Sequence, residues 1–380
     1  MRIEKIEVGR RAAQVNRAVE AVANQGLRSL DRAREAVGLE GRKARYDDSR
    51  YEFIGGDRDV LRRKHYDKSL KLLWKAERHA AWSTFHDGAD DLPLERMARE
   101  SMTKAERAAG KRLASAEFRA KLAREYTLAE RQALVRVLTA IGHGEAYAWL
   151  VSAEVLAEVK STGARAALTM QVMEEAKHFV VLRELIHAFG VEVPRQSAWE
   201  YLLLEQVLKA DGLDKLFGMN VLVEGIALSI FGMLAHLPGL EILRLFHLDE
   251  SRHTALPVNY FNEFPLSRWQ RLSPLARARR LNLVLPAIPL VFYLEESLAE
   301  LGIDALELGG SVIRKVSMLA ERAGFEPPGA GEALGERLNA LFNAYARLTR
   351  PHYVPRDYHR GETTRDAAAR AVEDEVFAAA

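Results

Sequence analysis

The 380-residue chain contains no cysteine. This absence excludes disulfide bonds, cysteine-ligated iron–sulfur clusters and rubredoxin-type iron sites. Any redox chemistry carried out by this chain must therefore take its electrons from a separate donor.

The chain also lacks a charge excess and a long uninterrupted apolar run. Its 55 basic and 53 acidic residues nearly cancel, so no net field favours nucleic acid as a partner. The N-terminus has no apolar signal-peptide core, and the most apolar stretch, residues 284–294, is short and contains Pro286 and Pro289. We therefore expect a cytoplasmic protein without a membrane span.

What the chain does contain is one short motif stated twice. Glu175 precedes His178 by three residues, and Glu250 precedes His253 by the same spacing, each pair inside an apolar stretch. On a helix, residues three apart project from the same face. Each motif is thus half of a metal site.

Each Glu-x-x-His motif follows a predicted helix that carries one isolated acid on its apolar stripe. These acids are Glu145 and Glu224. A buried carboxylate must be neutralised, hydrogen bonded or bound to a cation, because its desolvation is costly. Four glutamates with two neutral histidines would balance two divalent ions.

The turns between these helices place the acids at matching heights. The turn at residues 161–163 lies roughly 20 to 24 Å of helix from Glu145 and from Glu175. The turn at residues 237–239 lies roughly 18 to 21 Å from Glu224 and from Glu250. Antiparallel neighbours would therefore bring all four glutamates to one level.

A third Glu-x-x-His, formed by Glu184 and His187, has no matching isolated acid. Glu184 follows Glu175 by nine residues, which turns it about 180° to the other side of the same helix. We predict that this pair faces solvent or a neighbouring segment.

Apolar periodicity predicts an all-α protein. We expect helices over residues 10–37, 59–82 and 94–126 in an N-terminal region, 1–126, that packs on a four-helix bundle, 127–262. The bundle helices are predicted at 127–160, 164–189, 212–236 and 240–256, with a short helix at 199–209 in a crossover and a break or kink at Pro257. C-terminal helices at 269–301, 305–323 and 330–348 fill the region 263–350, and residues 351–380 form a polar tail.

The pattern resembles the ferritin-like di-iron carboxylate superfamily, in which two helices each give one Glu and two each give Glu-x-x-His to a four-helix core. The resemblance covers roughly residues 127–262. It implies a ferritin-like bundle with flanking helices and a ligand set of Glu145, Glu175, His178, Glu224, Glu250 and His253. It also implies that Glu174 and Asp249 each orient a ligand histidine on the facing helix.

Three branches of this superfamily can be compared by residue. Ribonucleotide reductase small subunits usually place a radical tyrosine where this chain has Leu182, and the cross-link of R2-like ligand-binding oxidases is not expected from the local sequences here. The string Asp249-Glu-Ser-Arg-His253 is similar to the motif of soluble acyl-carrier-protein desaturases. Arylamine N-oxygenases add a histidine about one turn before the last Glu, and His247 lies close to that position.

The resemblance implies a protein that activates dioxygen at two irons, or at a manganese–iron pair, and oxidises a small organic substrate with electrons from a ferredoxin or reductase. Two alternatives remain open: ferritin-like iron storage, and a radical-generating subunit. A homodimer is compatible with the number of apolar helix faces. Apolar side chains expected beside the site, as a substrate pocket, are Trp149, Phe179, Leu182, Leu228, Phe231 and Phe246.

Overall fold

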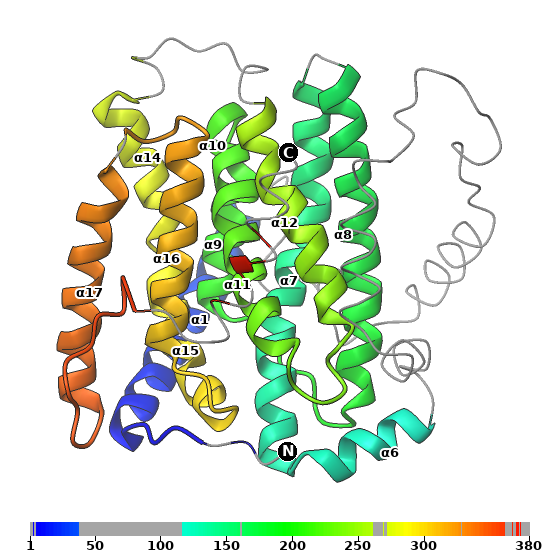
Figure 1. Cartoon of the computed structure of the whole chain (residues 1–380), viewed down its shortest axis with the longest axis vertical. Helices are drawn as coiled ribbons and strands as arrows, with labels where there is room; N and C mark the ends of the chain where they lie inside the picture. Colours follow the sequence, from blue (N-terminus) through cyan, green and yellow to red (C-terminus); the bar gives the residue numbers. More distant parts are fainter. Residues whose placement is uncertain are drawn as a thin grey trace.

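The computed structural model describes residues 3, 5–37, 116–159, 162–260, 269, 272–327, 329–361, 367, 370, 371 and 373. This part of the chain is helical and holds no strand, which confirms the all-α prediction (Figure 1). The helix predicted over residues 59–82 lies outside the described residues, as does the part of the predicted helix 94–126 before residue 116; its last part is the helix at residues 116–125.

Four packed helical segments supply the predicted site residues. α7 spans Leu128–Glu158 and begins with a capping box, in which Thr127 Oγ1 accepts from the Glu130 backbone and Glu130 accepts from the Thr127 backbone. α8 spans Thr162–Ala188, α11 spans Glu224–Leu234 and α12 spans Leu243–Tyr260. α7 packs along α8, α11 packs along α12, and α12 also contacts α8. We call these segments the site helices.

The connection between α8 and α11 contains the predicted short helix. α9 spans Ala198–Lys209 and is capped by Ser197, whose side chain accepts from the Glu200 backbone. It leads into α10, Gly212–Leu216, and a π-helical segment η2, Phe217–Val223, which continues directly into α11. The chain thus returns along α9 before α11 begins (Figure 1).

The turn predicted between the third and fourth site helices is present. Gly239 adopts a φ of 86°, a conformation that favours glycine. A Cβ on Gly239 would also lie 2.7 Å from Leu122 Cδ2, so the turn packs closely against the helix α6, Ala116–Glu125.

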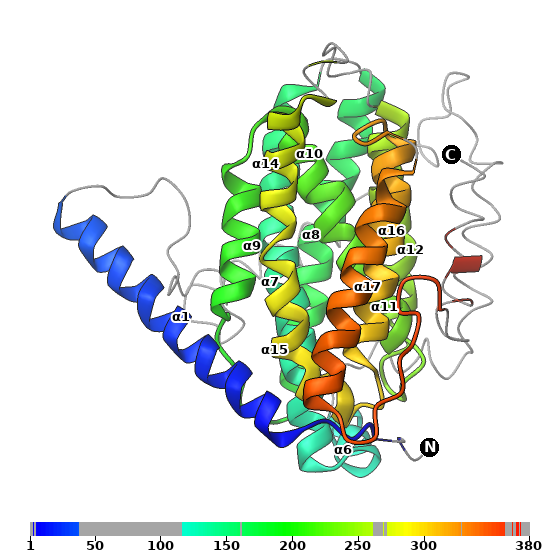
Figure 2. The same ribbon diagram turned by 90° about the vertical axis from the view of Figure 1, so that its left-hand side faces the viewer.

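A second layer of helices covers one side of the site helices. α15, Ala287–Glu300, packs on α7, and α16, Ala305–Arg322, packs on α11. α17, Ala330–Thr349, packs on α16, while α1, Arg10–Ala36, crosses α15, α9 and α17 (Figure 2). The single helix predicted over residues 269–301 is interrupted, because α14, Pro274–Val284, ends just before Pro286.

Part of the segment predicted as a polar tail packs against this layer. Tyr358 is 2% exposed, and its ring meets that of Phe342 on α17 with 6.1 Å between centroids. Arg314 on α16 donates to the backbone carbonyls of Tyr358 and His359. The chain after α17 therefore adds to the core at Tyr358 and His359.

Two described stretches are, by length and composition alone, long and apolar enough to cross a membrane. This corrects the expectation that the chain contains no stretch of that length. The most apolar 18 residues of Gly212–Leu234 are 94% buried within the protein, as the core helix of a folded domain would be. Pro274–Glu300 is 33% buried, so much of its surface faces outward.

Candidate metal centre

The structure brings all six predicted ligand residues together in the middle of the site helices. Each of the six is at most 2% exposed. Their ligand atoms form two overlapping groups, within each of which every atom lies within 4.8 Å of the others. The first group contains Glu145, Glu175, His178 and Glu250, and the second contains Glu175, Glu224, Glu250 and His253.

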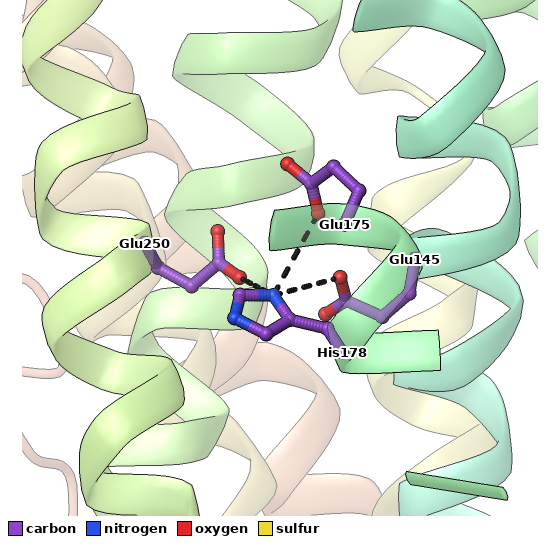
Figure 3. Close-up of side chains that lie close together, drawn as sticks. All are labelled: Glu145, Glu175, His178 and Glu250. Atoms are coloured by element: carbon purple, nitrogen blue, oxygen red, sulfur yellow. Dashed lines mark ion pairs between the residues drawn. The ribbon is translucent and has the colours of Figure 1, made fainter. Parts of the chain in front are cut away.

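The first group converges on the Nδ1 atom of His178 (Figure 3). This atom lies 2.9 Å from Glu250 Oε1, 3.4 Å from Glu145 Oε2 and 3.7 Å from Glu175 Oε2. Carboxylates from α7, α8 and α12 thus point at one position beside the imidazole.

The second group converges on the Nδ1 atom of His253. This atom lies 3.0 Å from Glu175 Oε1, 3.1 Å from Glu250 Oε2 and 3.7 Å from Glu224 Oε1. Glu175 and Glu250 therefore present one oxygen to each histidine, which is the arrangement of carboxylates that bridge two ions.

The outer nitrogens of the two histidines contact carboxylates across the helix pair. His178 Nε2 lies 3.0 Å from Asp249 Oδ2, and His253 Nε2 lies 2.9 Å from Glu174 Oε2. Arg252 donates to both Asp249 and Glu174, at 2.6 and 2.7 Å. Glu174 and Asp249 therefore have the contacts that the sequence predicted, each orienting the histidine of the facing helix.

Burial and neighbouring charges shift the pKa values of the four inner carboxyl groups in opposite directions. Desolvation, reinforced by the neighbouring carboxylates, raises the pKa of Glu145 and of Glu224 well above their usual range. Burial also opposes ionisation of Glu175 and Glu250, yet the nearby histidines lower the pKa of Glu175 well below its usual value and help lower that of Glu250 to about 2.

The two histidines show the complementary shift. Burial disfavours their charged forms, but contacts with Asp249 and the inner glutamates raise the pKa of His178, and contacts with Glu175, Glu250 and Glu174 raise that of His253, well above the usual range. Protons on both imidazoles and on the two raised carboxyls leave the six groups with no net charge. Two divalent ions in place of those four protons also give no net charge.

Several inner atoms are not satisfied by the protein itself. Within the described residues, Glu145 Oε2, Glu175 Oε2, His178 Nδ1 and Glu250 Oε1 are buried and have no hydrogen-bond partner. Buried polar atoms almost always have a partner, and these four face one common point. Oxygen and imidazole ligands in this number suit divalent iron or manganese, so the residues present fit a pair of such ions.

Two buried amides, which the sequence reasoning missed, contact the Glu224 side of the centre. Gln171 Nε2 donates to Glu175 Oε1 at 3.1 Å and to Glu224 Oε1 at 2.9 Å. Asn220 Nδ2, on η2, donates to Gln171 Oε1 at 2.9 Å and to the His253 carbonyl at 3.1 Å. Gln171 precedes Glu175 by one helical turn, and this spacing was the signal available in the sequence.

Pro257 explains why the His253 carbonyl is open to Asn220. The proline lies four residues after His253 and has no N–H to donate to that carbonyl. α12 continues through Pro257 to Tyr260 rather than ending there. The amide of Asn220 takes the place of the missing helical donor.

Aromatic side chains cover the His178 side. Phe246 stacks on the His178 ring with 4.2 Å between centroids, and Phe231 meets Phe246 edge-on at 5.3 Å. Leu182 and Leu228 are buried, and Phe179 is half-buried against the same core. Phe246 and Phe231 thus form an apolar wall on this side.

Trp149 does not belong to that wall. The prediction placed it beside the site because it lies one turn from Glu145, but its side chain is 41% exposed. Helical spacing gives the face of a residue, and whether another element covers that turn depends on the fold. Its assignment to an enclosed pocket is therefore wrong.

The remaining predicted residues lie outside the two ligand groups. His247 Nδ1 lies 3.0 Å from the Leu228 carbonyl, and its Nε2 lies 3.6 Å from Glu373 Oε1. Its ring thus has partners other than the inner carboxylates. His187, from the third Glu-x-x-His, is exposed on α8.

Comparison with known proteins returns no match to a protein-family model, to a curated protein or to a solved structure.

Proposed function

We propose that this chain is a ferritin-like di-metal protein that activates dioxygen to oxidise an organic, mainly apolar substrate. The observation that carries the proposal is the pair of carboxylates, Glu175 and Glu250, that each offer one oxygen to the position beside His178 and the other to the position beside His253. Two bound irons, or a manganese and an iron, would supply the electrons that reduce dioxygen.

The protein's own residues would hold and orient such a pair. Glu145 and His178 would complete one position, and Glu224 and His253 the other. Asp249 and Glu174 fix the ring orientation of the histidines by contacting their outer nitrogens. The rings of Phe246 and Phe231 cover the His178 side and would keep water from it.

Electrons for repeated turnover would come from outside the chain. With no cysteine in the sequence, the protein holds no iron–sulfur cluster of its own. A ferredoxin or a flavin reductase is the class of donor that fits this composition.

The test begins with metal-free protein under anaerobic conditions. Ferrous iron is titrated in and the bound iron per chain is counted; we expect roughly two. Dioxygen is then admitted, and its consumption and the visible absorbance are followed. We expect rapid consumption by the loaded protein.

Matched variants on one helix separate the site from its surroundings. His178→Ala should lose iron at its position and slow the reaction with dioxygen, whereas His187→Ala, which removes the exposed histidine of the third Glu-x-x-His, should behave as wild type. Absence of iron binding would overturn the proposal, and so would uptake of many irons per chain, which indicates storage.

A further inference from the structure

A cavity of about 640 Å³ lies between the site helices and the second layer of helices. Its inner wall includes Gly144, Val223 and Ala227, and Gly144 and Val223 adjoin Glu145 and Glu224 in the sequence. Its outer wall is made by α14, α15, α16 and α17. None of the six residues predicted for a substrate pocket lines it, so this flanking cavity is a separate feature of the described structure.

The cavity opens between α14 and α17. Among its described lining residues, those exposed to solvent all lie on these two helices: Pro274, Arg277, Ala278, Leu281, Ala333 and Arg337. The lining residues contributed by α7, α9 and α11 are buried or half-buried. A ligand would therefore enter between α14 and α17 and run inward toward the site helices.

Charge is concentrated at one end of the cavity. α14 begins there with Arg277 and Arg280, and Glu326 lies there between the end of α16 and the start of α17. Arg337 joins the lining about two turns along α17. Arg277 Nε lies 2.8 Å from Glu326, while the buried Arg280 lies 3.5 Å from Glu326 and 3.6 Å from Asp214. Even with Asp214 counted, guanidinium groups exceed carboxylates at this end.

The opposite end is aliphatic and aromatic. It is lined by the later part of α15, the start of α16 and the later part of α17, with Leu294, Leu298, Leu308 and Phe342. All four side chains are buried. The further acid of the lining, Glu200 on α9, lies 2.7 Å from the buried His143.

We propose that the flanking cavity binds an aliphatic chain that carries one anionic head group. The head would lie at Arg277 and Arg337, and the chain would extend past Gly144 and Val223 toward the aliphatic end. A neutral hydrocarbon would match the inner part but not the guanidinium excess, and a cationic amphiphile would be repelled by it. The further idea that this ligand is the substrate of the metal centre rests on the proposed function. Its binding to the flanking cavity does not.

Exposed leucines beside the mouth suggest how such a ligand arrives. Leu275, Leu281 and Leu285 are 67%, 49% and 50% exposed, and α14 carries three arginines and no acid. A helix that mixes leucine with arginine can lie at an anionic lipid surface. The ligand can therefore come either from solution or from a lipid layer, and the experiment distinguishes these sources.

The binding test uses the full chain without metal, so its outcome does not depend on any reaction with dioxygen. Dodecanoate, decanoate, dodecanol and dodecyltrimethylammonium are titrated calorimetrically below their aggregation concentrations. We expect dodecanoate to bind at least tenfold more tightly than the alcohol, and the cation not to bind. Each added methylene should strengthen binding by about fourfold, so dodecanoate should exceed decanoate by more than tenfold.

Paired variants locate the ligand. Val312→Trp fills the cavity from α16 and should abolish dodecanoate binding, whereas Val181→Trp, at a half-buried position of α8 outside the cavity, should not. Arg337→Glu should remove most of the preference for the acid over the alcohol, while Arg347→Glu, exposed on the same helix, should preserve it. Far-ultraviolet circular dichroism checks folding, and the arginine pair keeps the test decisive if Val312→Trp does not fold.

The source is tested with phosphatidylglycerol vesicles that contain hexadecanoate. Transfer of the acid to the protein from vesicles, with no binding of dodecanoate from solution, would support the proposal with a lipid surface as the source. Binding in neither arm, or equal dodecanoate affinity in wild type and folded Val312→Trp, would overturn it. If the protein binds the acid but never reacts with dioxygen, the proposed function is wrong and the binding proposal stands.

Discussion

The two halves of the candidate metal centre have the same inner groups and different surroundings. We call the Glu145 and His178 side the first half and the Glu224 and His253 side the second half. In both, one histidine faces three carboxylates, and its outer nitrogen contacts an acid on the opposite helix. The first half is covered by stacked aromatic rings, whereas the second is contacted by the Gln171 and Asn220 amides.

This difference indicates that the two candidate metal positions are not equivalent. Gln171 donates to Glu175 and Glu224 and so restrains the carboxylates of the second half before any ion binds. The first half lacks such a donor in the described structure, and Glu145 Oε2 has no hydrogen-bond partner there. A ligand held in place in advance loses less entropy on binding, so we expect the second half to bind its ion more tightly.

The largest expected effect comes from removing a carboxylate that both halves share. Glu250→Ala should abolish tight binding at both positions, because each histidine loses an oxygen within 3.1 Å. Glu145→Ala should leave one ion per chain in the second half. The measurement is the iron content of anaerobically loaded protein after gel filtration. Equal iron contents in these two variants would contradict a bridging role for Glu250.

An intermediate effect is expected from the acids that orient the histidines. Asp249→Asn should weaken metal binding in the first half, and Glu174→Gln in the second, each by about 10- to 100-fold. Competition with a chromophoric chelator measures both affinities. Glu184→Gln, on the other face of α8, is the control and should change neither. If Asp249→Asn weakened only the second half, the crossed arrangement of histidine and acid would be wrong.

The grouping of the six residues of the candidate centre was predictable from the sequence, because each is a polar residue at an apolar position and because their spacing repeats. The contacts of Glu174 and Asp249 with the facing histidines were expected from the resemblance to the di-iron carboxylate superfamily. The four site helices and the turn at Gly239 were predicted closely, since Thr127 and Gly239 are strong local signals for helix ends. The turn predicted at residues 161–163 lies partly outside the described residues, and Gly163 already belongs to α8.

The parts that could not be predicted depend on contacts between distant segments or on backbone geometry. Gln171 and Asn220 are ordinary polar residues until η2 brings them within 2.9 Å of each other. The flanking cavity is lined by helices from α7 to α17, and no local pattern reports such a space. Trp149 has the right spacing but lies where no element covers it sufficiently.

A smaller effect is expected from the amides that distinguish the halves. Gln171→Ala removes two hydrogen bonds to carboxylates and should weaken the second ion by about tenfold, with little change in the first. Asn220→Ala leaves the His253 carbonyl and Gln171 Oε1 without this donor and should lower the free energy of unfolding by about 1 to 3 kcal/mol.

Urea denaturation of the metal-free protein measures the change in the free energy of unfolding that Asn220→Ala causes. Ser229→Ala is a suitable control, because Ser229 is equally buried but donates only to a carbonyl of its own helix, that of Gly225. It should change stability by less than Asn220→Ala does. If the Asn220→Ala protein is as stable as the wild type, the hydrogen bonds of Asn220 to Gln171 and to the His253 carbonyl do not restrain the second half.

The smallest effect is expected at Lys177, which contacts only the first half. Its Nζ lies 2.7 Å from Asp249 Oδ2, but the side chain is 39% exposed and Arg252 also donates to Asp249. An exposed ion pair contributes at most about 1 kcal/mol, so Lys177→Ala should weaken the first ion by less than about fivefold and leave the second unchanged. Arg252→Ala should weaken both ions, because Arg252 contacts Glu174 as well as Asp249. Chelator competition on these two variants therefore separates a contact with one half from a contact shared by both, and a Lys177→Ala protein with both ions weakened would show that the halves bind as one unit.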